Sequence, residues 1–270
     1  MNRRSATRGH HTSRDVLLVV DVGNTQTHFG AFDGERLVQH WRFATVRDST
    51  ADELGAALRN LMELRGLGLA DLKASIISST VPQLAPEWAE TCRRYLGHEP
   101  IVVGPGLRTG MDIRYPNPSE IGADRLVNAV AIRERFGGPA ICVDFGTAVN
   151  FDIIDADGAY LGGVLAPGVE ISLAALTERG AQLPRIDLVP PRSVIGKSTV
   201  EAIRSGVIYG YAAMVDGIVR RLRGELGQGS DVIATGGLAG HIVPFTDEVD
   251  EVDDLLTLTG LRLLHGRNTR

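Results

Sequence analysis

An apolar run followed by an Asp-x-Gly turn occurs twice in this chain, and this repetition constrains the fold more than any other feature. Val16 to Val20 lead into the turn that begins at Asp21, and Ile141 to Val143 lead into the turn that begins at Asp144. An unbroken apolar run is typical of a strand that is buried on both faces. The repetition predicts two similar α/β halves, each beginning with a hairpin, with a cleft between them. The alternative is a coincidence of two unrelated hairpins.

The remaining patterns predict further strands and helices in each half. In the first half we expect strands at 27–32, 37–43, 73–79 and 101–103 and helices at 54–64, 83–96 and 119–136, the last with Ser119 as its N-cap. In the second half we expect strands at 148–154, 160–161 and 231–235 and helices at 169–179, 199–223 and 253–264. This order predicts a flexible tail at 1–14, an N-terminal domain at 15–137 and a C-terminal domain at 138–270.

Composition and charge exclude several classes of protein. Of the 270 residues 43% are hydrophobic and the net charge is −5, which fits a globular chain and not a nucleic-acid-binding protein with a basic face. No apolar run approaches the roughly 20 residues that span a bilayer. Met1 to Arg14 lack the apolar middle of a secretory signal, and the only cysteines are Cys92 and Cys142. We therefore expect a cytoplasmic protein without nucleic-acid or membrane partners.

The two Asp-x-Gly turns have the composition of phosphate-binding loops. Gly23 lets a ligand approach the backbone, and Asn24 and Thr25 add polar donors. A phosphate would repel Asp21 unless a cation bridged the two, so this carboxylate suits the Mg²⁺ that a nucleotide carries. The second turn repeats the pattern with Asp144, Gly146 and Thr147. The alternative for either turn is an inert, solvated hairpin turn.

A third candidate is the segment from Gly122 to Arg125 at the start of a predicted helix. The apolar stripe of that helix leaves Asp124 pointing away from the core, near backbone N–H groups that favour anions. A carboxylate there would accept a proton from an attacking hydroxyl, and Arg125 offers a fork suited to a substrate carboxylate. The alternative is a pair of first-turn charges in water.

Two further glycine motifs carry less information. Gly196 to Ser198 resemble the end of a P-loop, but Pro191 stands where that motif requires glycine and no strand precedes it. Gly236 and Gly237 follow an apolar strand, which would let a helix approach an adenine ring or would simply form a strand-to-helix turn. We exclude the P-loop and leave both interpretations of the Gly236–Gly237 motif open.

With these residues in view, the sequence resembles the type III pantothenate kinases, which belong to the superfamily of acetate kinase, sugar kinases, Hsp70 and actin. The resemblance runs from about Leu17 to Leu264. Matching stretches are Asp21 to Thr25, Tyr115 to Arg125, Asp144 to Ala148, Gly162 to Gly168, Gly196 to Gly206 and Thr235 to Gly237. It implies an α/β fold of two ribonuclease-H-like domains, as in the actin-like ATPases, with an interdomain cleft.

The resemblance also implies an activity, which is ATP-dependent phosphorylation of pantothenate to 4'-phosphopantothenate in coenzyme A biosynthesis. Asp124 resembles the general base, and Asp144 resembles the carboxylate that holds a monovalent cation, K⁺ or NH₄⁺, beside the Mg²⁺ of ATP. The implied ATP-binding residues are Asp21, Val22, Gly23, Asn24, Thr25, Gln26, Thr27, His28 and Thr147. The implied pantothenate-binding residues are Tyr115, Gly122, Ala123, Asp124, Arg125 and Thr199, some reached across a homodimer interface.

The chain departs from the family pattern at two adjacent positions. Val149 and Asn150 stand where the second phosphate loop commonly continues with two threonines. Their substitution removes two hydroxyls near the nucleotide. It therefore leaves open an alternative function, a catalytically weak or inactive nucleotide- or metabolite-binding regulator of the same fold. A kinase of another small polyol or sugar is a third possibility.

Overall fold

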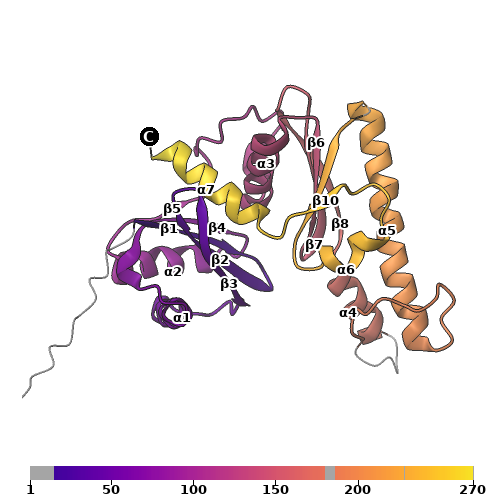
Figure 1. The fold of residues 1–270 in the computed structure, drawn as a ribbon, viewed down its shortest axis with the longest axis horizontal. Coiled ribbons are helices and arrows are strands. Elements are labelled where there is room, and N and C mark those ends of the chain that lie inside the picture. The colour runs from indigo at the N-terminus through magenta and orange to yellow at the C-terminus, as the bar shows by residue number, and fades with distance from the viewer. Residues whose placement is uncertain (1–14, 180–185, 228, 270) are drawn as a thin grey trace, which may run out of the picture.

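The computed structural model describes residues 15–179, 186–227 and 229–269, so the expected tail at 1–14 lies outside the described residues. Two five-stranded sheets form the framework (Figure 1). The first contains β1 (Val16–Val22), β2 (Gln26–Asp33), β3 (Arg36–Ala44), β4 (Leu72–Ser79) and β5 (Ile101–Val102). The second contains β6 (Ala140–Phe145), β7 (Ala148–Ile154), β8 (Tyr160–Pro167), β9 (Asp231–Thr235) and β10 (Glu251–Val252).

The two sheets have the same topology. Their strand orders are β3-β2-β1-β4-β5 and β8-β7-β6-β9-β10. In each sheet the first three strands along the chain pair antiparallel and the last two join in parallel. The hairpins predicted after Asp21 and Asp144 therefore occupy equivalent places, and the predicted repetition of the architecture is confirmed.

Helices cover both sheets. They are α1 (Ala51–Glu63), α2 (Leu84–Thr91), α3 (Ala123–Phe136), α4 (Val169–Arg179), α5 (Thr199–Leu226), α6 (Ala239–Ile242) and α7 (Leu256–Asn268). Short 3₁₀ turns occupy Leu69–Asp71, Pro118–Glu120 and Val243–Phe245, and a π-helical segment occupies Cys92–Leu96. Among the described residues no helix has the length and apolar character needed to cross a membrane.

Helix α3 packs between the two sheets and joins their cores (Figure 1). Val127 and Val130 on one side of α3 pack with α7 and the first sheet, whereas Ala129 and Ile132 on the other side pack against the second sheet. At Gly260 in α7 a Cβ atom would lie 2.3 Å from the carbonyl oxygen of Val127, so glycine permits the close approach of the two helices. The C-terminal helix thus returns to the first sheet, and the domain boundary at 137/138 stays a prediction.

The predicted N-cap of α3 was wrong. The helix begins at Ala123 with Gly122 as its N-cap, and Ser119 lies in the preceding 3₁₀ turn. Ile121 is extended and separates the turn from the helix, while the Ser119 hydroxyl donates a 2.6 Å hydrogen bond to the Asn117 side chain. The correction moves the helix N-terminus to the segment that carries Asp124, which therefore lies in the first turn.

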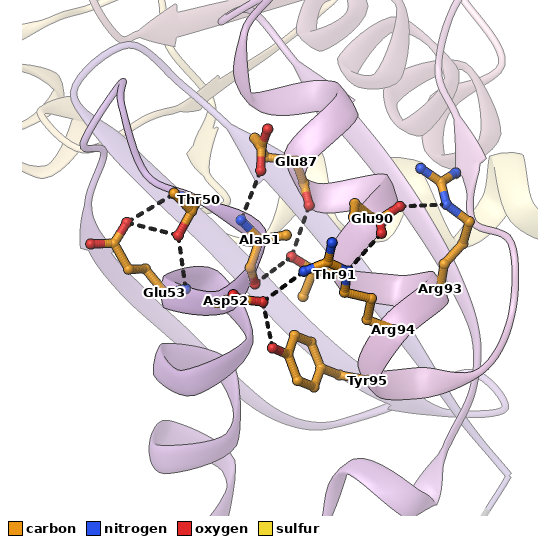
Figure 2. Close-up of polar contacts among 10 residues, drawn as sticks. All are labelled: Thr50, Ala51, Asp52, Glu53, Glu87, Glu90, Thr91, Arg93, Arg94 and Tyr95. Atoms are coloured by element: carbon orange, nitrogen blue, oxygen red, sulfur yellow. Dashed lines mark hydrogen bonds and ion pairs between the residues drawn. The ribbon is translucent and has the colours of Figure 1, made fainter.

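Hydrogen bonds cap helix α1 and connect it to helix α2 in the first half of the chain (Figure 2). Thr50 and Glu53 form a capping box at the start of α1. Glu87 of α2 accepts a 2.7 Å hydrogen bond from the backbone N–H of Ala51, and the Thr91 hydroxyl donates to the Ala51 carbonyl. Because these contacts tie α1 to α2 on the face away from α3, they stabilise the sheet without taking part in the cleft.

Candidate active site

The first sheet presents a row of polar side chains to a cleft. Asp21 on β1 pairs with His28 on β2, and His28 pairs with Arg42 on β3. Residues directly opposite one another in adjacent strands point to the same face of a sheet. All three line a cleft of about 740 Å³, which is the size of a typical small-molecule site.

The second sheet presents the equivalent row to the same cleft. Asp144 on β6 pairs with Asn150 on β7 on one side and with Thr235 on β9 on the other, and Asn150 pairs with Leu165 on β8. These four residues line the cleft as well. The repeated topology therefore places Asp21 and Asp144 at matching positions, one from each sheet.

Asp124 reaches the same cleft from the first turn of α3. Its Oδ1 accepts a 2.9 Å hydrogen bond from the backbone N–H of Arg125, as expected for a carboxylate at a helix N-terminus. Asp21, Asp124 and Asp144, which are distant in the sequence, are thus brought together around one cleft.

Most of the other candidate residues lie in this cleft. It is lined by Gly23, Asn24, Thr25, Gln26, His28, Gly122, Arg125 and Thr147, and by Gly236 and Gly237. Val22, Thr27, Ala123, Tyr115 and Thr199 are not among its described lining residues. Val22 and Thr27 are buried, and the Thr27 hydroxyl lies 2.9 Å from that of Thr45. The roles expected of these five residues stay predictions.

Burial weakens the acidity of the three carboxyl groups, and repulsion between carboxylates adds to the effect at Asp21 and Asp144. Burial raises the pKa of Asp21 to about 7, with the charge of Asp124 adding to the effect. Burial also raises the pKa of Asp144 to about 8, and both other carboxylates contribute. The pKa of Asp124 is raised by burial and is held back by the hydrogen bond from Arg125. Ionising all three carboxyl groups at once is therefore costly, and a bound cation would reduce that cost.

Sequence reasoning missed the residues that hold Asp144 in place. Asn128 on α3 donates a 3.2 Å hydrogen bond to Asp144 Oδ2 and accepts a 2.8 Å hydrogen bond from the Thr257 hydroxyl on α7. A polar residue that is fully buried in an apolar helix stripe was the available signal. At Gly236, where φ is +93°, a Cβ atom would lie 2.5 Å from Asp144 Oδ1, so the turn requires glycine.

Sequence reasoning also missed Arg42, which lines the cleft from β3. Its Nη2 donates a 3.2 Å hydrogen bond to the carbonyl oxygen of Asp254, in the loop before α7. No ion pair of Arg42 is found within the described part of the chain. Nothing in the local sequence distinguishes this arginine from other surface arginines, because its position depends on strand register.

Residues 17–221 match the family described as type III pantothenate kinase. The chain is 50% identical over 254 residues to a type III pantothenate kinase from Moorella thermoacetica, a match that covers 94% of this chain and 100% of that one. It is 51% identical over 261 residues to another from Streptomyces griseus, covering 94% and 98% of the two chains. The chain belongs to the type III pantothenate kinase family. It therefore has type III pantothenate kinase function and is a phosphotransferase.

Solved structures with low identity share the fold of this pantothenate kinase. An activator of 2-hydroxyisocaproyl-CoA dehydratase from Clostridium difficile aligns with a TM-score of 0.55 at 14% identity, covering 94% of this chain and 92% of that one. Component A of (R)-2-hydroxyglutaryl-CoA dehydratase from Acidaminococcus fermentans aligns with a TM-score of 0.54 at 15% identity, covering 94% and 96%. The expected fold class, two mixed α/β halves of the actin-like ATPase type, is confirmed.

The buried carboxylates of the kinase predict an unusual dependence of stability on pH. A raised pKa means that the folded protein keeps a proton that the unfolded chain has lost. The contribution of Asp144 is therefore fully present below the usual value near 3.8 and is lost as the pH rises through about 8. Asp144→Asn removes this contribution while Asn128 keeps a hydrogen-bond acceptor.

We expect the melting temperature of the nucleotide-free wild type to fall more steeply between pH 5 and pH 8.5 than that of Asp144→Asn. We also expect the variant to be the more stable protein at pH 8.5. Differential scanning calorimetry without K⁺ or nucleotide measures both. Parallel curves for the two proteins would contradict the assignment of a costly buried charge to Asp144.

Proposed function

We propose that the cleft binds ATP and pantothenate together and that Asp124 is the general base for transfer of the γ-phosphoryl group to the primary hydroxyl of pantothenate. The observation that carries this proposal is the position of Asp124, which lines the same cleft as both Asp-x-Gly turns. Phosphoryl transfer depends mainly on positioning and charge stabilisation, for which a shared cleft suffices. A carboxyl group with a raised pKa is a stronger base than an ordinary aspartate.

The two turns support a site for the ATP phosphates between the sheets. The backbone N–H of Gly23 donates to the carbonyl oxygen of Gln26, and that of Gly146 donates to Ala148, so both turns are tight. We assign the phosphates to the Asp21–His28 stretch and to Thr147. Arg42 supplies a positive charge that no carboxylate within 4 Å neutralises among the described residues, and charge of this sign stabilises transferring phosphates.

The residues also fit the cations that the family requires. Among the described residues no group of three or more His, Cys, Asp or Glu side chains is arranged to hold a metal. We assign the cations to positions where the ATP phosphates would supply further ligands. Asp21 Oδ1 is buried without a hydrogen-bond partner in the described chain, which suits the Mg²⁺ of ATP. When bound there, Mg²⁺ would neutralise the charge of the phosphates.

Asp144 and Asn150 fit a monovalent cation. They face each other across β6 and β7, and Asn150 Oδ1 is also buried without a partner in the described chain. Carboxylate and amide oxygens are the hard ligands that such a cation prefers. We therefore assign K⁺ or NH₄⁺ to Asp144, with Asn150 as a second ligand.

The departure from the family pattern at Val149 and Asn150 has a limited effect on the cleft. Adjacent residues of a strand point to opposite faces. Val149 is fully buried in the core of the second half, whereas Asn150 lines the cleft. One of the two missing hydroxyls would thus lie outside the cleft, and the amide of Asn150 replaces the other. This favours an active kinase over an inactive regulator.

We further propose that the site is completed by a second copy of the chain. Tyr115 and Thr199 do not line the cleft of a single chain. Apolar side chains are exposed near Thr199, among them Val194 at 68% and Ile195 at 78%. Gly206 on α5 has open space where a Cβ would be, and Figure 1 shows α5 at the outer edge of the second half. An exposed apolar face of this kind is typical of an association surface.

Sedimentation velocity tests the dimer. We expect a species of twice the 29.0 kDa chain, and Gly206→Leu should dissociate it because the added side chain enters the interface. Gly224→Leu is the matched control, since Gly224 also lies on α5 with open space around it. A monomeric wild type, or equal behaviour of the two variants, would refute the proposal.

Replacement of Asp124 tests the catalytic assignment. Asp124→Asn keeps the size of the side chain and removes the base, so turnover should fall by about 10²- to 10⁴-fold while ATP binding and the melting temperature change little. A coupled ADP-release assay with pantothenate and a panel of sugars, in K⁺ and in Na⁺, measures it. Unchanged turnover would remove Asp124 from the role.

The same assay separates the proposed activity from its alternatives. Pantothenate-dependent release that K⁺ stimulates supports the proposal. Release with a sugar and not with pantothenate indicates a different acceptor. Binding of ATP with no release under any condition indicates a regulator.

A further inference from the structure

A buried ion pair connects the cleft to the interior of the second sheet. Arg125, in the first turn of α3, donates from Nε to Asp152 Oδ1 on β7 at 2.8 Å. The Tyr160 hydroxyl on β8 donates to the same oxygen at 2.9 Å. The Asp152 side chain is fully buried, and that of Arg125 is 10% exposed. Arg125 lines the cleft, whereas Asp152 is not among its lining residues.

The sheet is shaped to receive this arginine. Asp152 lies two residues after Asn150 on β7 and therefore points to the same face of the sheet, one row further from the strand end. The residue opposite Asp152 on the neighbouring strand β8 is Gly163. A Cβ atom at Gly163 would lie 2.4 Å from Arg125 Nη2, so the absence of a side chain leaves room for the guanidinium.

Stability does not account for the pair. Burial of an ion pair costs desolvation energy that is recovered only when every polar atom is satisfied. Here Asp152 Oδ2 and Arg125 Nη2 are both buried without hydrogen-bond partners in the described chain. Replacement of a buried ion pair by apolar residues of similar volume is often neutral or stabilising. The pair therefore has another use.

The geometry points to Asp152 and Tyr160 as positioning residues that fix Arg125 so that its guanidinium binds the carboxylate of pantothenate beside Asp124. The inference rests on the proposed function. An arginine whose Nε is held by an internal carboxylate keeps its plane fixed. Because Nη2 is buried against Gly163, Nη1 is the terminal nitrogen that is left for a second, external carboxylate. Asp124 is adjacent to Arg125 on α3. The contacts that hold Arg125 therefore also set the distance between the bound carboxylate and the base.

Two variants and a control test this assignment. Asp152→Asn keeps the shape and removes the charge, so the KM for pantothenate should rise about 10- to 100-fold while the KM for ATP stays within about twofold. Tyr160→Phe should raise the KM for pantothenate by a few-fold. Asp216→Asn is the matched control because Asp216 is also buried in the second half and accepts hydrogen bonds there, from the backbone of Asp247 and Glu248.

A double-mutant cycle with Arg125→Lys separates positioning from a structural role. If Asp152 acts through Arg125, Asp152→Asn adds little to the KM effect of Arg125→Lys. Additive effects would overturn the inference, as would a lowered melting temperature with an unchanged KM for pantothenate. If Asp152→Asn does not fold, Tyr160→Phe decides the matter, and an unchanged KM in that variant overturns the inference.

The proposed function and this inference fail in different ways. A wild type that does not phosphorylate pantothenate refutes both. An active wild type whose Asp152→Asn variant behaves like Asp216→Asn refutes only the role of Asp152 and Tyr160.

Discussion

The burial of three carboxyl groups around one cleft is the constraint on which this structure depends. Asp21, Asp124 and Asp144 come from three elements; burial raises the pKa of all three, and the charge of Asp124 raises those of Asp21 and Asp144 further, so ionising all three together is unfavourable. Such an arrangement persists only when the surrounding fold is rigid enough to impose it. Cations that accompany a nucleotide relieve the repulsion, so the unfavourable charge of the free enzyme becomes affinity for its substrate.

Helix α3 provides that rigidity. It packs on both sheets, and along its length it carries the proposed base Asp124, the proposed substrate ligand Arg125 and the buried Asn128 that holds Asp144. Asn128 in turn is held by Thr257 of α7, which packs on the first sheet. One helix thus sets the relative positions of the groups to which we assign roles at the phosphates and at the acceptor. This explains why the C-terminal helix returns to the N-terminal half.

Much of this arrangement could be predicted from the sequence because it repeats. Two apolar runs that end in Asp-x-Gly turns indicate two equivalent hairpins, and equivalent hairpins place Asp21 and Asp144 at equivalent strand ends. The expectation that Val149 and Asn150 both remove a hydroxyl near the nucleotide was wrong for Val149, because adjacent strand residues face opposite sides and only Asn150 lines the cleft. Asn128 combined a polar side chain with an apolar helix stripe and was detectable for that reason.

Other features depend on contacts that no local pattern contains. Arg42 reaches the cleft through the register of β2 and β3, and Asp152 meets Arg125 through the register of β7 and the placement of α3. Ser119 had the right chemistry for an N-cap, but the extended Ile121 moved the start of the helix to Ala123. Local sequence patterns indicate the conformation that each of these residues favours, whereas tertiary packing determines where each one lies.

We propose that Asp124 and the two phosphate turns act on substrates held in a single cleft. A crystal structure with a non-hydrolysable ATP analogue, Mg²⁺, K⁺ and pantothenate tests it most directly. We expect the primary hydroxyl of pantothenate to lie within about 2.6–3.2 Å of the Asp124 carboxylate, in line with the γ-phosphate. Pantothenate bound with its hydroxyl remote from Asp124, or a nucleotide bound outside the two turns, would contradict it.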